Sequence, residues 1–242
     1  REQYERINVG GTANVVAAAV NAGVKRIVLF STIAIYGPAG GRILNEDTPP
    51  CPDTFYAETK LAAENIVLAA KNNEGQNIGT VLRLGAVYGS RIKGNYERLA
   101  RALARNRFIP MGQGLNRRTL IYDKDVAQAA LLAASHPAAA GRVFNVTDGQ
   151  FPTLNEIIEA ICHALGRKVP HFSLPVGPLQ KLAGVIEKTA HVTGLKLPAV
   201  KTMIEKYNED IAVSGDLIQK KLGFSPRYDL RTGWQEALRE MR

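Results

Sequence analysis

The spacing of apolar residues predicts alternating helices and strands in the first part of the chain. Residues 3–22 carry apolar side chains at helical spacing, and Gly23 follows as a C-terminal cap. Residues 26–30 form a short apolar run of strand length, residues 54–72 are again helical in pattern, and residues 78–87 form a second apolar run. Helix, strand, helix and strand in this order favour a parallel sheet covered by helices, and therefore an α/β fold.

The remaining segments are shorter. Their patterns predict helices over residues 95–107, 123–135, 154–165, 216–222 and 230–241, and strands over residues 118–122, 142–146 and 211–213. Residues 37–53 hold four prolines and three glycines, and we expect them to form a long loop over a functional site. Later in the chain we expect short amphipathic helices, separated by Pro170, Pro175, Pro178 and Pro198.

Composition and charge restrict the class of protein. Of the 242 residues, 45% are hydrophobic and 22% are charged, which is ordinary for a globular enzyme. The formal charge of +9 is spread along helices rather than clustered with aromatic residues. We therefore expect most of these charges to lie on a solvated surface and a few to bind an anionic small substrate, and we expect no nucleic acid polymer. No apolar run approaches the length of a membrane span, and the first residues do not resemble a signal peptide.

The cysteines and histidines lead to two further expectations. Cys51 and Cys162 are far apart in the sequence and form no Cys-x-x-Cys pair, which favours reduced thiols and a cytoplasmic protein. The four histidines are scattered without ligand spacing, so we expect no metal site.

The most informative chemistry lies between residues 30 and 60. Tyr56 and Lys60 are four residues apart, so on a helix the ammonium can lie beside the phenol. A nearby cation favours the phenolate and lowers the pKa of a tyrosine, which makes it a usable base. Thr32 ends the first strand and could present its hydroxyl to the same substrate oxygen. The spacing by itself is common by chance and usually indicates an ordinary amphipathic helix with a lysine at its surface.

The order of these motifs is more specific than the tyrosine–lysine pair. Ser31 and Thr32 close a strand, a Tyr-Gly turn follows, and the pair comes after a proline-rich loop. In this arrangement the chain resembles the extended short-chain dehydrogenase/reductase family, in particular its nucleotide-sugar epimerases and dehydratases. The resemblance begins at the Asn8-Val-Gly-Gly-Thr segment and extends to the C-terminus.

The resemblance implies a Rossmann-like parallel sheet in residues 1–166 and a smaller, mostly helical substrate-binding region in residues 167–242, with some interleaving. A dinucleotide-binding sheet normally begins with a strand, a glycine-rich turn and a helix, which this chain lacks. We therefore expect the sheet to be N-terminally incomplete. We expect weak dinucleotide binding by the chain alone.

By the same resemblance, Tyr56 is the acid/base at the reacting hydroxyl, Lys60 holds the nicotinamide ribose and Thr32 hydrogen-bonds the substrate oxygen. The implied cofactor is NAD, with NADP left open, and Ser31 is either structural or on the cofactor side together with Tyr56 and Lys60. Asn8 is implied near the floor of the site, although a helix cap or a surface position explains it nearly as well.

Two further segments resemble binding elements of the family. The strand containing Arg83 and Leu84 resembles the one that passes under the nicotinamide, although relatives often carry a proline and an asparagine where this chain has Leu84 and Ala86. Arg118 resembles the arginine that binds the diphosphate of a nucleotide sugar, and a guanidinium fork suits phosphoryl oxygens. A surface arginine beside Arg117 is the alternative. Relatives commonly dimerise through helices that include residues 54–72, so we expect a homodimer.

The two residues after Thr32 reduce the number of reactions that fit the sequence. Dehydratases of the family carry an acidic pair there, whereas this chain has Ile33 and Ala34, which cannot transfer protons. The remaining chemistry is hydride transfer at one carbinol carbon, as in a nucleotide-sugar 4-epimerase or a related sugar oxidoreductase. A 3β-hydroxysteroid or flavonoid-type reductase shares the predicted residues, and a non-catalytic member of the family is the third alternative.

Overall fold

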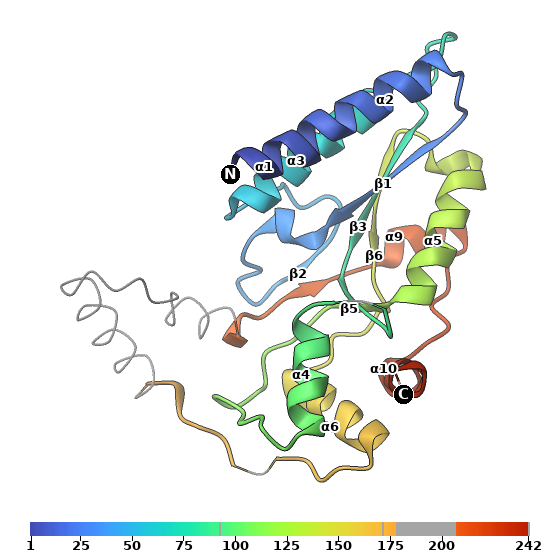
Figure 1. The fold of residues 1–242 in the computed structure, drawn as a ribbon. Coiled ribbons are helices and arrows are strands. Elements are labelled where there is room, and N and C mark those ends of the chain that lie inside the picture. The colour runs from blue at the N-terminus through green and yellow to red at the C-terminus, as the bar shows by residue number, and fades with distance from the viewer. Residues whose placement is uncertain (92, 171, 178–206, 242) are drawn as a thin grey trace, which may run out of the picture.

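The centre of the molecule is a three-stranded parallel sheet (Figure 1). The computed structural model describes residues 1–91, 93–170, 172–177 and 207–241. The strands lie in the order β1 (Ile27–Thr32), β3 (Gly79–Leu84) and β6 (Arg142–Val146), with β3 in the middle. This confirms the predicted α/β fold with a parallel sheet, and β6 has the residues predicted for it.

Helices cover both faces of this sheet, as Figure 1 shows. One face carries α3 (Phe55–Leu68) and a long N-terminal rod, which is built from α1 (Glu2–Tyr4), the π-helical segment η1 (Glu5–Gly10) and α2 (Gly11–Asn21). The other face carries α5 (Asp123–Ser135) and α9 (Asp216–Leu222).

The side chains of β3 explain why both faces need a cover. Val81 belongs to a buried cluster with Val16 of α2 and Val67 of α3, whereas its neighbour Leu82 belongs to the opposite cluster with Ile218 of α9. Successive side chains of a strand point to opposite faces, so a strand that is apolar throughout is buried on both sides.

The predicted strand over residues 78–87 is divided in two. The amide of Gly85 donates to Val146 of the central sheet, and the next amide, of Ala86, donates to Thr119. The chain then continues as β4 (Ala86–Tyr88), which pairs in parallel with β5 (Leu120–Tyr122). A single apolar run therefore serves two sheets, because its hydrogen-bond partners change at the glycine.

The predicted loop over residues 37–53 contains a short strand, β2 (Ile43–Leu44). It pairs in parallel with β7 (Ala212–Val213), almost 170 residues later in the sequence. A strand of two residues is too short to leave a periodic signal. The pairing matters for the site because it attaches the loop to the C-terminal part of the chain.

A second core lies beyond the end of the sheet. It includes side chains of three helices, namely α4 (Asn95–Ala104), α6 (Leu154–Leu165) and α10 (Leu230–Glu240). Two short helices elsewhere in the molecule are η2 (Ile33–Tyr36) and η3 (Pro137–Ala139). Trp234 of α10 is fully buried and stacks on Tyr88 with ring centroids 4.8 Å apart.

The boundaries of α6 follow from local signals. Thr153 and Glu156 form the predicted capping box, and Gly166 ends the helix in the left-handed conformation. The segments next to Pro178 and Pro198, where we expect short helices, lie outside the described residues. Within the described ranges, none of the helices combines the length and apolar character that crossing a membrane requires.

Candidate active site

A cavity of about 490 Å³ opens where β1 and β3 end. We call it the strand-end cavity. Four residues that the sequence analysis selects line it, namely Thr32, Tyr56, Leu84 and Arg118. They come from β1, α3, β3 and the segment before β5, so the parallel arrangement of the strands brings them together at one edge of the sheet.

Thr32 is the last residue of β1. Its backbone is extended, and its Oγ1 accepts a hydrogen bond of 3.2 Å from the amide of Ala34, which caps η2. The hydroxyl proton of a threonine remains a donor when its oxygen accepts. Thr32 is therefore held by the chain in a position from which it can donate to a molecule in the cavity.

Tyr56 lies in the first turn of α3, which Thr54 caps by accepting a hydrogen bond from Ala57. Its side chain is 40% exposed, and its ring packs edge-on against Tyr4 with centroids 5.9 Å apart. Burial raises the pKa of Tyr56 above its ordinary value, and the nearby Tyr4 raises it further. The spacing of Tyr56 and Lys60 predicts a lowered pKa, and this prediction is wrong for the protein in this state.

The position of Lys60 explains the difference. It lies one turn after Tyr56, as expected, but its Nζ donates a hydrogen bond of 2.5 Å to the carbonyl oxygen of Phe30 in β1. Burial lowers the pKa of the ammonium, and Glu64 partly opposes this. Because the ammonium is held by the strand, burial rather than the cation decides the pKa of the phenol.

A buried polar network includes Ser31 and Arg83, which directly precede Thr32 and Leu84 of the cavity wall. The Oγ of Ser31 donates to Glu64 at 2.5 Å, and Glu64 forms an ion pair with Arg83, with an Nη2–Oε2 distance of 2.7 Å. Arg83 also donates to the hydroxyl of Tyr36, which donates in turn to Asn145 of β6. The network connects β1, α3, β3 and β6 at the level of the site.

This network decides where the predicted cofactor residues lie. The side chains of Ser31 and Arg83 are buried and bonded to Glu64, whereas Leu84 lines the cavity. Glu64 is not among the residues predicted for the site. A buried arginine in a central strand, such as Arg83, requires a carboxylate partner. Glu64 lies four residues after Lys60, on the same face of the helix, and this position was the signal in the sequence that could have identified it.

Asn8 occupies a supporting position behind α3. Its side-chain amide donates to Oγ1 of Thr59 at 3.0 Å, and that hydroxyl donates to the carbonyl oxygen of Tyr56 at 2.9 Å. Through these two hydrogen bonds, Asn8 of η1 is connected to the backbone of Tyr56 in α3. Asn8 is not among the residues that line the cavity.

The two adjacent arginines have different surroundings. Arg118 lines the strand-end cavity, and its Nη2 donates to the carbonyl oxygen of Tyr207 at 2.6 Å. Arg117 forms an ion pair with Asp210. Adjacent residues of an extended segment point in opposite directions, which explains why one of them faces the cavity and the other does not.

Further residues of the cavity wall lack a recognisable sequence signal. Among them are Tyr4, Asp53, Tyr96 and Glu209, from four separate segments of the chain. Ile33, Ala34 and Ala86 contribute apolar surface to the wall.

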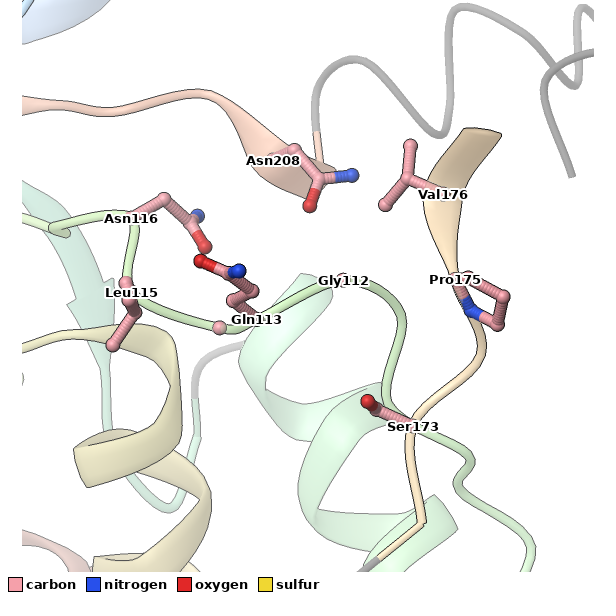
Figure 2. Close-up of a pocket in the computed structure, with 9 residues that line it drawn as sticks. Gly112, Gln113, Leu115, Asn116, Ser173, Pro175, Val176 and Asn208 are labelled. Atoms are coloured by element: carbon pink, nitrogen blue, oxygen red, sulfur yellow. The ribbon is translucent and has the colours of Figure 1, made fainter. Parts of the chain in front are cut away.

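A second cavity of about 590 Å³ lies next to residues 112–116 (Figure 2). Amide side chains of Gln113, Asn116 and Asn208 contribute to its wall together with Ser173. None of the residues predicted for catalysis belongs to it. The described residues also contain no group of three or more histidine, cysteine, aspartate or glutamate side chains that could hold a metal ion.

Residues 1–147 match the family model described as NAD dependent epimerase/dehydratase family. The chain belongs to this family. The match covers more than half of the chain and includes Tyr56, Lys60 and Arg118, and it confirms the resemblance to the extended short-chain dehydrogenase/reductases.

Individual relatives align over almost the whole chain. An uncharacterized protein of Sinorhizobium fredii, y4nL, is 31% identical, and the alignment covers 98% of this chain and 68% of the relative. The N-acetyl-alpha-D-glucosaminyl-diphospho-ditrans,octacis-undecaprenol 4-epimerase of Escherichia coli O157:H7 is 27% identical over 97% of this chain and 71% of its own. The chain therefore spans about 70% of the length of these relatives.

A solved structure supports the same assignment. The structure of MoeE5 in complex with UDP-glucose and NAD superposes with a TM-score of 0.71 at 27% identity, covering 97% of this chain and 71% of that one. The described sheet and the helices around it therefore have counterparts in that structure.

Proposed function

We propose that this protein is an NAD-dependent nucleotide-sugar 4-epimerase or a closely related sugar oxidoreductase. The observation that carries the proposal is the presence of Thr32, Tyr56 and Arg118 in the wall of one cavity. The names of two relatives support the substrate class, since one is a 4-epimerase of a diphospho-linked sugar and the other binds UDP-glucose together with NAD.

Each residue has a task that its position supports. Arg118 binds the diphosphate with its guanidinium fork. Thr32 donates to the oxygen on the reacting carbon, and Tyr56 takes the proton of that hydroxyl and later returns it. One polar residue and one base on the same oxygen hold the carbinol carbon in a single orientation.

Lys60, which lies one turn after Tyr56 but does not line the cavity, and Leu84 of the cavity wall fit the nicotinamide half of NAD. Lys60 has an ammonium with three N–H donors, one of which is bonded to Phe30, and Leu84 offers an apolar surface for the ring. NAD held there would supply a reversible hydride acceptor for the carbinol carbon. Ile33 and Ala34 in the wall support epimerisation over dehydration, because neither can carry a proton.

The test is an assay of full-length protein with NAD and UDP-hexoses. We expect interconversion of the 4-epimers by NMR, with a transient nicotinamide absorbance that depends on the sugar. Tyr56→Phe should lower kcat by about 10²-fold or more. Tyr228→Phe is the matched control, since Tyr228 packs on Tyr122 in the second core. Absence of both epimerisation and the sugar-dependent signal would refute the proposal.

A 3β-hydroxysteroid or flavonoid-type reductase predicts a different result for one variant. Such a substrate has no diphosphate, so Arg118→Ala would leave its turnover unchanged. A selective loss of affinity for nucleotide sugars supports the epimerase instead. A non-catalytic protein would show neither turnover nor a nicotinamide signal.

Three further proposals concern the whole protein. We infer that residues 167–242 form the substrate-binding region, which is supported by the positions of Glu209 and Ile211 in the cavity wall.

We propose a homodimer formed through α3 and the adjacent rod, where Ile7 and Val15 are more than half exposed. Light scattering tests the dimer. A cytoplasmic location agrees with two unpaired cysteines and can be tested by fractionation.

A further inference from the structure

Two segments far apart in the sequence form one wall of the strand-end cavity. Residues 116–119 precede β5, and residues 207–213 lead into and include β7. Arg118 and Thr119 from the first segment and Glu209 and Ile211 from the second line the cavity. The positions of these four side chains therefore depend on how the two segments are joined.

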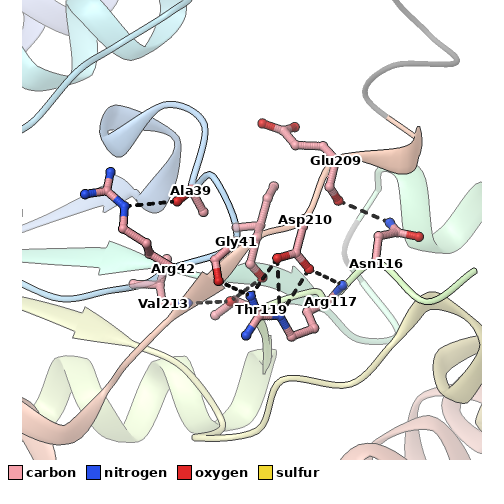
Figure 3. Close-up of polar contacts among 10 residues, drawn as sticks. Ala39, Gly41, Arg42, Asn116, Arg117, Thr119, Glu209, Asp210 and Val213 are labelled. Carbon is pink, nitrogen blue, oxygen red and sulfur yellow. Dashed lines mark hydrogen bonds and ion pairs between the residues drawn. The ribbon is translucent and has the colours of Figure 1, made fainter.

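The joint is made by side chains (Figure 3). The side-chain amide of Asn116 donates to the carbonyl oxygens of Tyr207 and Glu209, each at 3.1 Å. Thr119 accepts from the amide of Val213 and donates to the carbonyl oxygen of Ile211, both at 3.0 Å. These bonds fix the backbone of the second segment at both of its ends.

Arg117 and Asp210 occupy the centre of the joint. Oδ1 of Asp210 accepts from the backbone amide of Arg117 at 2.6 Å, and its two oxygens accept from Nε and Nη2 of the guanidinium. The amide of Ile211 donates back to the carbonyl oxygen of Arg117 at 2.9 Å. A two-pronged arginine–carboxylate contact fixes orientation as well as distance.

The same guanidinium reaches a third segment. Nη2 of Arg117 donates to the carbonyl oxygen of Gly41 at 2.8 Å, in the loop of residues 37–53. This loop continues into Asp53 and Thr54, which also line the cavity. Arg117 therefore connects the loop to the wall that carries Arg118.

We propose that Arg117 and Asp210 are positioning residues for substrate binding. Asp210 stands between Glu209 and Ile211, and Arg117 stands next to Arg118, so each is the immediate neighbour of residues that line the cavity. The pair sets the direction in which the Arg118 guanidinium enters the cavity. This inference rests on the proposed function, because it assigns the diphosphate of a nucleotide sugar to Arg118.

The pair contributes to binding rather than to global stability. The side chains of Arg117 and Asp210 are 29% and 30% exposed. Partly exposed ion pairs add little to the free energy of unfolding, although a two-pronged contact adds more than a single bond, so we expect a small loss of stability when this pair is broken. A change in the direction of Arg118, by contrast, would act directly on a charge-assisted contact with the substrate.

The experiment compares Asp210→Asn and Arg117→Gln with the unmodified full-length protein. We expect the KM for UDP-hexose and the Kd for UDP, measured by calorimetry, to rise about tenfold. We expect kcat to stay within about twofold, since the groups at the reacting carbon are unchanged. Arg117→Lys keeps the charge without the fork and should recover only part of the affinity.

Two matched variants serve as controls. Asp216→Asn and Arg101→Gln remove the same charges from exposed ion pairs on α9 and α4. Neither residue lines the strand-end cavity, so the Kd for UDP should not change. The melting temperature of every variant should stay within about 3 °C of the unmodified protein.

The outcomes separate the inference from the function on which it rests. If Arg118→Ala weakens UDP binding and Asp210→Asn does not, the inference is wrong and the proposed function stands. If Asp210→Asn lowers kcat as strongly as affinity, or unfolds the protein, a structural role replaces positioning. If the unmodified protein binds no UDP, the proposed function itself fails.

Discussion

The carboxylate of Glu64 and the guanidinium of Arg83 form an ion pair between α3 and β3, with 1% and 6% of the two side chains exposed. Ser31 and Tyr36 complete its hydrogen bonds. Through its bond with Ser31, Glu64 also connects the strand that ends in Thr32 with the helix that carries Tyr56.

Breaking this pair should strongly destabilise the protein. Glu64→Gln or Arg83→Met leaves an unpaired or poorly bonded partner away from water, at a cost of about 3–5 kcal/mol. Replacing both residues with apolar ones should cost less than either single change, because no charge is left buried. Urea unfolding measures the difference. Arg101→Gln, which breaks an exposed pair on α4, should cost less than about 0.5 kcal/mol.

The phenol of Tyr56 should titrate above its ordinary pKa in the protein without ligands. Burial disfavours the phenolate, and Lys60 is bonded to Phe30 rather than to the phenol. The measurement is a spectrophotometric titration of the protein minus that of Tyr56→Phe. A difference curve with a midpoint below the ordinary pKa of tyrosine would contradict this prediction. It would show instead that the ammonium of Lys60 lowers the pKa of Tyr56.

Asp148 should make stability depend on pH. Its pKa is raised to about 7, mainly by burial and also by the nearby Asp125, while the backbone amide of Gln150 opposes the shift. Its Oδ2 has no hydrogen-bond partner among the described residues. Since the folded pKa is the higher one, this group's contribution is complete at acidic pH and is lost as the pH rises from about 4 to about 7.

Asp148→Asn removes this dependence. Its free energy of unfolding relative to the unmodified protein should increase with pH over that range, by at most about 1.4 kcal/mol per pH unit. Urea unfolding at pH 5 and pH 8 provides the comparison. The exposed Asp216→Asn variant should show no such trend, and a flat difference for Asp148→Asn would contradict the assigned shift.

Gly79 permits a close approach of β3 to the end of α3. A Cβ atom at this position would overlap the carbonyl oxygen of Val67, which is backbone and cannot rotate away. Gly79→Ala should therefore destabilise the protein by about 1–3 kcal/mol. Gly10→Ala is the matched control, because it lies in a helical segment with no atom within 4 Å of the added Cβ. It should be neutral or slightly stabilising.

Much of the secondary structure could be predicted from local signals. The helix Asp123–Ser135 and the strand Arg142–Val146 have the predicted residues, and the capping box at Thr153 opens α6 where expected. Caps, turns and periodicity act over a few residues, so they are readable in a short window. The division at Gly85 was not readable, because it depends on hydrogen bonds to Thr119 and Val146.

By itself, the sequence determined the α/β fold class, the family and the residue types of the candidate site, since these depend on spacing and on order along the chain. The tertiary structure alone decided that Arg118 rather than Arg117 faces the cavity, and that Lys60 is bonded to Phe30. It also decided that Arg83 is bonded to Glu64. The physical reason is that burial and hydrogen-bond partners come from distant segments, and these set orientation and pKa.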